Sequence, residues 1–245
     1  MIHPYCDEDA ILLAPIHTAV FPHNPLSPRA FGSYVSTMLA YGAKAWVAAE
    51  DVPLGYALAV PVPGLPHIVD LKGCIAPAWQ RQGFGGELLR RVLSDMQQTA
   101  VQQVSCQVRT LDNPAARFLR KHGFYVEHEE WQMMRADLRH LPQPVEKDGV
   151  KIVTQRRAEA VRHFHHLFST SFAGLPWDQP YSPQEIDTAL DSAVDILFLT
   201  LDSKPIGFAW LLLQASGLGM VEPLGVLPEY QQQGYGRFLL LSALH

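Results

Sequence analysis

The sequence is short of charged residues and has no excess of basic ones. Charged side chains make up 18% of the 245 residues, below the roughly 25% of an average soluble domain, whereas disordered chains are rich in charge and poor in apolar residues. The 19 Lys and Arg residues stand against 24 Asp and Glu, so the net charge is −5. No surplus of positive charge is available to neutralise phosphates. These shortages argue against a disordered chain and against a nucleic-acid partner.

Membrane and secretory features are equally scarce. The apolar run Phe208–Leu213 is among the longest, far below the ~20 residues that span a bilayer. Asp7, Glu8 and Asp9 stand where a signal peptide would be basic and then apolar. Three cysteines, odd in number and far apart, are typical of reduced thiols and not of a disulfide framework. We therefore expect a cytoplasmic protein with no membrane partner.

What the sequence does contain is an internal repeat. The segment QRQGFG at 80–85 returns as QQQGYG at 231–236. Further upstream, PLGYA at 53–57 matches PIGFA at 205–209. A Ser-Pro pair precedes both, at 27–28 and again at 182–183, and each pair puts an N-cap residue before a proline at the first helical position. Three matches in the same order indicate duplication of a unit of about 150 residues.

Both units are expected to have an α/β (α+β) fold with the same order of elements. Two helices, at 9–20 and 28–40 in the first unit, precede three apolar strands at 45–49, 54–62 and 68–76. A glycine turn and an amphipathic helix follow. The first unit then continues with a strand at 104–108, a short helix at 113–122, and a closing hairpin of 125–128 and 131–135. In the second unit the three strands are expected at 195–201, 206–213 and 220–227.

The repeat is expected to be incomplete in its second copy. His245 aligns with Ser94, in the middle of the first unit's long helix. We therefore expect a complete domain at 1–140, a linker at 141–149, and a second domain at 150–245 that stops after its glycine-turn helix. An unpaired strand edge invites association. The first unit or a partner in a homodimer would cover that edge, or the chain is a truncated form of a longer protein.

The two glycine turns carry the strongest functional signal. In each turn a strand enters and a helix leaves, and the glycines let the backbone approach a ligand closely. The first N–H groups of the helix have no intrahelical partner, and the helix dipole adds positive charge there. One such turn could be a plain connection, but two in the same context favour a phosphate or pyrophosphate site. A P-loop ending is absent, and Leu88 stands where a dinucleotide fingerprint has its third small residue.

Both turns resemble motif A of the GNAT acyltransferases, Gln/Arg-x-x-Gly-x-Gly/Ala. The segments are IAPAWQRQGFGG at 75–86 and VLPEYQQQGYGR at 226–237, each with an aliphatic strand end, a proline and an aromatic residue before the glutamine. NPAA at 113–116, followed by KHGF at 121–124, resembles the family's later Asn-x-x-Ala…Gly-Phe segment. Two such units in tandem resemble the two-domain GNAT proteins that include mycothiol synthase.

This resemblance implies a mixed, splayed sheet with acetyl-CoA in the cleft beside the turn. The pyrophosphate would bind the amides of 82–86, the pantetheine arm would pair with the strand at Cys74 and Ile75, and Asn113 would face the cofactor. By resemblance, the cofactor-binding residues are Cys74, Ile75, Gln80, Arg81, Gln82, Gly83, Phe84, Gly85, Gly86 and Asn113 in the first unit, and Val226, Gln231, Gln232, Gln233, Gly234, Tyr235, Gly236 and Arg237 in the second. We expect the first unit to hold the better-formed site.

Acyl transfer to an amine needs a general base to remove a proton from the ammonium group. Asp70 and Glu222 precede the two motif glutamines by ten and nine residues on the entering strands. A difference of one residue turns a side chain to the other face of a strand unless a bulge intervenes. The alternative for each is an exposed strand carboxylate without a catalytic role. Family members often have a tyrosine four residues before the Gly of Gly-Phe as the acid for the leaving thiolate, and Leu119 stands there.

The sequence therefore predicts an N-acyltransferase that moves an acetyl group from acyl-CoA to the amine of a small molecule. The alternative is a CoA-binding or regulatory module without turnover, which Leu119 and the incomplete second unit favour. The net negative charge slightly favours a cationic amine. His163 and His166 lack the i, i+4 spacing and third ligand of a typical zinc site, so no metal is expected. Trp177 and Tyr181 line a substrate loop or pack in the core.

Overall fold

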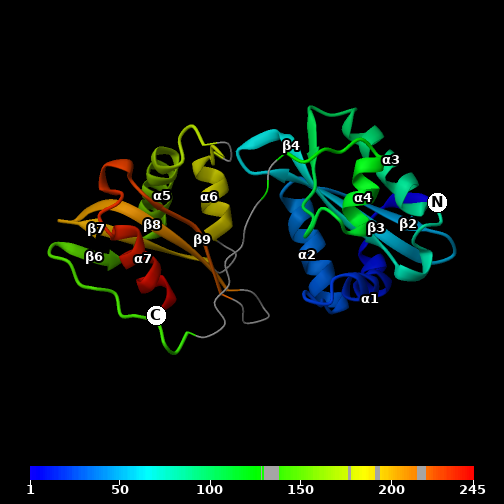
Figure 1. Cartoon of the computed structure of the whole chain (residues 1–245). Coiled ribbons are helices and arrows are strands. Elements are labelled where there is room, and N and C mark those ends of the chain that lie inside the picture. Colours follow the sequence, from blue (N-terminus) through cyan, green and yellow to red (C-terminus); the bar gives the residue numbers. More distant parts are fainter. Residues whose placement is uncertain (128, 130–137, 176–177, 191–193, 214–218) are drawn as a thin grey trace. The chain divides into compact units, whose positions relative to one another are not determined.

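The chain folds into two compact units, residues 1–129 and 130–245, in a computed structural model (Figure 1). The structure describes residues 1–127, 129, 138–175, 178–190, 194–213 and 219–245. Within them, the first unit has a sheet of five strands in the order β1-β2-β3-β4-β5, and the second has one of four strands in the order β6-β7-β8-β9. Each unit is thus built around its own sheet.

The elements of the first unit follow the order expected from the sequence. They are β1 (Ile2–Pro4), α1 (Ala10–Val20), α2 (Pro28–Ala40), β2 (Lys44–Ala49), β3 (Pro53–Val62), β4 (Leu65–Ile75), α3 (Phe84–Met96), β5 (Gln103–Ser105) and α4 (Pro114–Lys121). Neighbouring strands from β1 to β4 are antiparallel. β5 is parallel to β4 and pairs with it only opposite 68–70. The sheet is therefore mixed, and β4 and β5 separate after Asp70 and Ser105.

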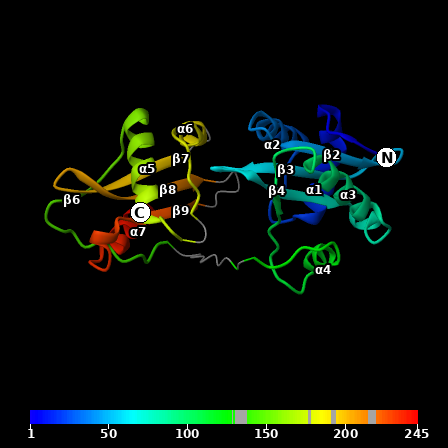
Figure 2. The ribbon, with the colours of Figure 1, turned by 90° about the horizontal axis from the view of Figure 1, so that it is seen from above.

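The sheet of the first unit is covered by helices on both faces. On one face, α1 and α2 bury Leu13, Phe31 and Val35 against strand residues that include Val47 and Leu58. On the other face, α3 covers the sheet, as Figures 1 and 2 show. Its buried residues are Leu88, Leu89, Val92 and Met96. Their spacing of one, three and four positions places them on one side of a helix, which is the face expected from the sequence.

The second unit repeats this arrangement. Its elements are β6 (Val150–Val153), α5 (Arg157–Ser171), α6 (Pro183–Ala189), β7 (Val194–Leu201), β8 (Lys204–Leu213), β9 (Gly219–Val226) and α7 (Tyr235–Leu244). Its strands are antiparallel throughout the described residues. α5 and α6 bury Phe164, Leu167 and Ile186 on one face, and α7 buries Leu239 on the other.

The Ser-Pro pairs begin the second helix of each unit, as expected. Ser27 Oγ accepts a hydrogen bond of 3.2 Å from the Ala30 N–H. Ser182 Oγ accepts one of 3.2 Å from the Glu185 N–H, and the Glu185 carboxylate accepts one of 2.7 Å from the Ser182 N–H. Each pair thus satisfies N–H groups that the first helical turn leaves without partners.

Three sequence expectations differ from the structure. The first strand of each sheet, β1 and β6, was not predicted, because three or four residues give too short a pattern to separate from a loop. β5 ends at Ser105, so the expected strand at 104–108 is wrong in its second half. Residues 125–127 have no regular secondary structure, which contradicts the first strand of the expected hairpin. Residues 128 and 131–135 of that hairpin, and Trp177, lie outside the described residues.

Candidate functional site

The glycine turn is the same structure built twice. Arg81 and Gly83 have φ angles of 61° and 101°, and their counterparts Gln232 and Gly234 have φ angles of 60° and 82°. Left-handed residues within a tight turn point successive N–H groups to one side, which makes a concave anion site. The helices α3 and α7 begin directly after these glycines. Each turn therefore presents backbone donors at the positive end of a helix dipole.

Two glutamine side chains hold each turn in shape. The first glutamine of each pair donates to the carbonyl oxygen of the last strand residue. The second donates to the carbonyl oxygen four residues before it, within the turn. The bonds are Gln80 Nε2 to Ile75 O (2.9 Å), Gln82 Nε2 to Ala78 O (2.8 Å), Gln231 Nε2 to Val226 O (2.8 Å) and Gln233 Nε2 to Glu229 O (3.0 Å). Because these amide donors bond within the turn, the groups left for a ligand are chiefly backbone N–H groups.

The two glycines of the first turn meet different demands. Gly83 needs its positive φ, which side-chain-bearing residues rarely adopt. Gly85 has an ordinary φ, and a Cβ there would meet Ile75 and Phe118 at 3.7 Å, an ordinary contact. The fold therefore does not require a glycine at Gly85, because a small side chain there has room beside Ile75 and Phe118. In the second unit a Cβ on Gly236 would likewise meet only Val226, at 3.9 Å.

Beside the first turn, one edge of β4 has no strand partner among the described residues. Residues 71–75 pair with β3 along one side, while β5 reaches no further than Asp70. Cys74 and Ile75, predicted to meet the pantetheine arm, lie on this segment. Burial raises the pKa of the Cys74 thiol to about 12, so the thiol stays protonated and belongs to the core on the side of α1 and α2.

Asp70 lies where β4 and β5 separate. Its Oδ1 accepts a hydrogen bond of 2.8 Å from Ser105 Oγ. Burial, with the negative charge of Asp70 as a second cause, raises the pKa of Tyr34 and raises that of Cys106 to about 11. The carboxylate therefore has protonated hydroxyl and thiol groups around it, and it faces the layer formed by α1 and α2.

Glu222 lies at a bulge in β9. Leu211 is opposite Val221 and Ala209 is opposite Leu224, so two residues of β9, Glu222 and Pro223, stand across from one residue of β8. Because of this extra residue, Glu222 lies on the same face of its sheet as Asp70 does in the first unit, despite the difference of one residue in their spacing from the motif glutamines. Glu222 contributes to the raised pKa of Tyr181, after burial and the charge of Glu185. Like Asp70, Glu222 thus faces the paired helices, but it lies nearer the glycine turn than Asp70 does.

Several predicted residues have structural tasks. Asn113 caps α4, because its Oδ1 accepts a hydrogen bond of 2.7 Å from the Ala116 N–H, so its NH₂ group is the part of the side chain that can donate to a cofactor. Leu119 is buried and apolar, and Tyr125 is 80% exposed. His163 Nδ1 is 2.7 Å from Gln155 Oε1. In the described part of the chain, no three metal-ligating side chains gather to form a possible metal site.

Sequence reasoning missed the side chains that α4 places on the first turn. The Phe118 and His122 rings lie 4.6 Å apart. Phe118 adjoins Gly85, and the His122 ring comes within 3.5 Å of the Cβ position of Gly86. The helical spacing of Phe118 and His122 was a visible signal, but their contact with α3 depends on how α4 docks.

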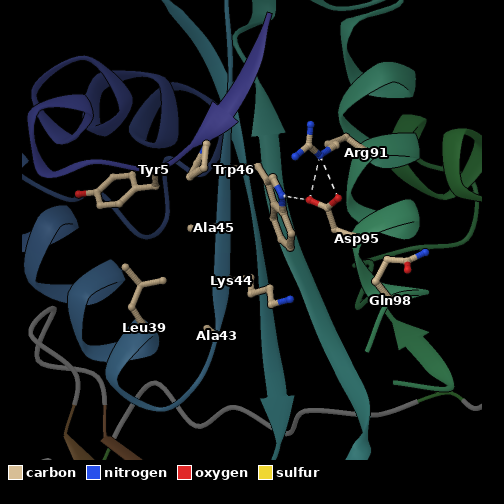
Figure 3. A pocket seen from close by; sticks show the side chains of 10 residues that line it. Tyr5, Leu39, Ala43, Lys44, Ala45, Trp46, Arg91, Asp95 and Gln98 are labelled. Atoms are coloured by element: carbon tan, nitrogen blue, oxygen red, sulfur yellow. Dashed lines mark hydrogen bonds and ion pairs between the residues drawn. The ribbon is translucent and has the colours of Figure 1, made fainter. Parts of the chain in front are cut away.

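A separate hollow of about 460 Å³ lies beside β2, and Figure 3 shows its side chains. Asp95 accepts hydrogen bonds from Trp46 Nε1 (2.7 Å) and Arg91 Nε (2.9 Å) and so ties α3 to β2. The hollow is lined by Pro4, Tyr5, Leu39, Ala43, Lys44, Ala45, Trp46, Arg91, Asp95 and Gln98. None of these residues belongs to the glycine turn or to the surroundings of Asp70.

Within the described residues, no helix combines the length and the apolar composition needed to cross a bilayer.

Both units match family models of the same kind. Residues 42–126 match the acetyltransferase (GNAT) domain, and residues 161–245 match the acetyltransferase (GNAT) family. The chain therefore belongs to the GNAT acetyltransferases and carries two GNAT domains in tandem. This confirms the family and the fold class expected from the paired glycine turns.

Individual relatives agree with the tandem arrangement. Mycothiol acetyltransferase from Nocardia farcinica (strain IFM 10152) is 28% identical over 206 residues, which cover 78% of this chain and 65% of that protein. The chain thus spans about 65% of that relative's length. A tandem GNAT protein from the clavulanic acid biosynthesis pathway superimposes with a TM-score of 0.72 at 12% identity, covering 100% of this chain and 84% of the other. A GCN5-related N-acetyltransferase from Sphaerobacter thermophilus gives 0.70 at 15% identity, covering 100% and 82%. At these identities the two structures establish the shared fold alone.

Proposed function

We propose that this protein is an N-acetyltransferase that moves an acetyl group from acetyl-CoA directly to the amine of a small molecule. The observation that carries the proposal is the continuous path along β4 in the first unit. It runs from the backbone donors of the glycine turn, along the edge at 71–75 that has no described strand partner, to the Asp70 carboxylate. Asp70 precedes Ile75 by five positions on the extended strand, a distance of about 17 Å. An extended acyl-CoA arm, held by its pyrophosphate at one end, would bring its thioester toward the other.

Asp70 would act as the general base in this site. Its carboxylate would take a proton from the substrate ammonium, directly or through a water. The free amine would then attack the thioester carbonyl carbon, and the tetrahedral intermediate would collapse to the amide with loss of the CoA thiolate. The nitrogen gives up its second proton in this collapse, and that proton balances the one that the thiolate takes up from its donor. Leu119 stands where family members often have a tyrosine, and a leucine cannot protonate that thiolate. Another side chain must therefore be the donor. Burial, and after it the charge of Asp70, raises the pKa of Tyr34 and that of Cys106. Both groups therefore lie near Asp70, and this position makes them the candidate donors.

The second glycine turn is proposed as a second site for the pyrophosphate of CoA, with Glu222 as its candidate base. Its backbone and its glutamine bonds repeat those of the first turn. The first unit remains the proposed principal site, because β5 provides a second wall where β4 becomes free. In the second unit, β9 has β8 as its one described strand neighbour. The net charge of −5 favours a cationic amine over an acidic one in either site.

Two matched variants test the assignment. Gly85→Val should abolish CoA binding by the first unit with little loss of fold, because a Cβ there meets only ordinary contacts. Gly236→Val makes the same change in the second turn. CoA affinity is measured by calorimetry, and turnover by thiol release from acetyl-CoA with polyamines, amino sugars and amino acids. Loss of turnover in Gly85→Val alone supports the proposal.

Two results would count against it. If CoA affinity and turnover survive Gly85→Val but disappear in Gly236→Val, the second unit holds the principal site. If CoA binds and no amine in the panel is acetylated, the protein is a CoA-binding module and not an enzyme. Circular dichroism of each variant shows whether the fold is kept.

A further inference from the structure

We propose that Lys147 is a phosphate-binding residue of the second glycine turn, supplied from outside the turn itself. The proposal rests on the proposed function, in which that turn binds the pyrophosphate of CoA. Lys147 Nζ donates a hydrogen bond of 3.1 Å to the Gln233 carbonyl oxygen. The same ammonium is 3.7 Å from the position that a Cβ on Gly234 would occupy, and it lies 5.3 Å from the centre of the Tyr235 ring. One cation thus contacts three consecutive residues of the turn.

The segment that carries Lys147 is anchored on both sides of it. Towards the N-terminus, Leu141 is buried, and the Pro142 carbonyl oxygen is 3.2 Å from His245 Nε2. On the other side, the Gly149 carbonyl oxygen accepts a hydrogen bond of 2.9 Å from the Asp202 N–H. The segment expected to be a linker therefore follows α7 from its last residues to its first turn. The position of Lys147 over the turn follows from this path.

The two turns share a backbone but differ in where their positive charge comes from. Arg81 occupies the first left-handed position of the first turn, and the neutral Gln232 occupies it in the second. Lys147 brings a cation to the second turn from the preceding segment. Arg237, which replaces Gly86 at the start of the helix, adds another. Two cations around a helix N-terminus with free backbone donors form an arrangement that suits a phosphate.

Lys147 also has the capacity to bind a ligand where it stands. An ammonium group has three donors, and the carbonyl of Gln233 takes one. The side chain is exposed, so a phosphate can approach without displacing packed groups. Its contribution to affinity should therefore be modest and should depend on salt concentration, as for any exposed charge.

The test uses the full chain with Gly85→Val, so that CoA binding reports on the second turn. Lys147→Gln and the matched control Lys151→Gln, an exposed lysine on β6, are made in this background. CoA is titrated by calorimetry at low and high salt. We expect Lys147→Gln to weaken CoA binding about three- to tenfold at low salt and to reduce the salt dependence, whereas Lys151→Gln leaves both unchanged. Lys147→Arg should restore most of the affinity.

The outcomes distinguish failure of the Lys147 proposal from failure of the proposed CoA site on which it rests. Unchanged CoA affinity in Lys147→Gln refutes the role of Lys147 and leaves the second site in place. Tighter binding also refutes it, because the lysine would then compete with the ligand for the turn. If the Gly85→Val chain binds no CoA while the Gly236→Val chain does, the second turn is not a CoA site and both claims about it fail.

Discussion

Ser105 Oγ donates a hydrogen bond of 2.8 Å to Asp70 Oδ1 at the last position where β4 and β5 are paired. Beyond this pair the strands separate, and the part of β4 that follows has β3 as its one described strand neighbour. A carboxylate at the position where the two strands separate is oriented by the neighbouring strand through this hydrogen bond.

Asp70→Asn should lower the rate of acetyl transfer by about 10²- to 10⁴-fold, the usual contribution of a general base, while CoA binding is retained. The asparagine keeps an oxygen for Ser105 but cannot take the proton. Ser105→Ala is the matched control, because it keeps the carboxylate and removes only the orienting bond, so its effect should be much smaller. Thiol release and calorimetry measure the two properties. Full activity in Asp70→Asn would remove Asp70 from the mechanism.

Gly73→Ala should destabilise the first unit by about 1–3 kcal/mol, as overpacking does. A Cβ at Gly73 would lie 2.3 Å from the Tyr56 carbonyl oxygen, so β3 and β4 would have to move apart. Gly85→Ala is the comparison, because its Cβ has room and alanine favours the helix by up to ~1 kcal/mol. Urea unfolding of both variants checks this. Equal midpoints would contradict the close approach of the two strands.

Stability of the first unit should fall as the pH drops below about 6.5, because His17 is buried and neutral. Its Nε2 donates to the Asn24 carbonyl, and its Nδ1 therefore accepts from the Tyr56 hydroxyl. Burial lowers the pKa of His17, so the unfolded chain binds a proton more readily than the folded one. The contribution of neutral His17 to stability is complete at pH values above its pKa in the unfolded chain. It is lost as the pH falls through its lower pKa in the folded chain. Unfolding between pH 5 and 8 measures it, and His17→Gln should flatten that part of the profile.

Asp95→Ala should destabilise the first unit by about 1–2 kcal/mol, because the buried Trp46 indole loses its acceptor. Asp95→Asn should cost less than about 1 kcal/mol, since an amide oxygen can still accept from Trp46 and the exposed ion pair with Arg91 is weak. The hydrogen bond from Arg91 lowers the pKa of Asp95, so this contribution is lost only as pH falls into the acid range. Thermal unfolding followed by tryptophan fluorescence distinguishes the two variants. Equal midpoints for alanine and asparagine would show that Trp46 does not depend on this acceptor.

Local patterns were enough to predict most elements of both units. The start of α2 at Pro28 and its end at Ala40 agree with the sequence, because a capping serine and a proline act within one helical turn. The apolar side of α3 was visible from the spacing of Leu88 and Val92. The glycine turns were recognisable because a left-handed backbone requires residues such as Gly83. Each of these signals depends on neighbours a few positions away.

Long-range pairing decided the rest. β1 and β6 are strands only because β2 and β7 lie beside them. The side of the sheet that Glu222 faces was set by the extra residue in β9, which no count from the glutamine reveals. Lys147 meets Gln233 across 86 residues of chain. The sequence alone determined the duplication, the order of elements and the two glycine turns, because local backbone preferences encode them. Only the tertiary structure placed Ser105 beside Asp70 and Lys147 over the second turn, because these contacts depend on strand register and on the path of the chain between elements.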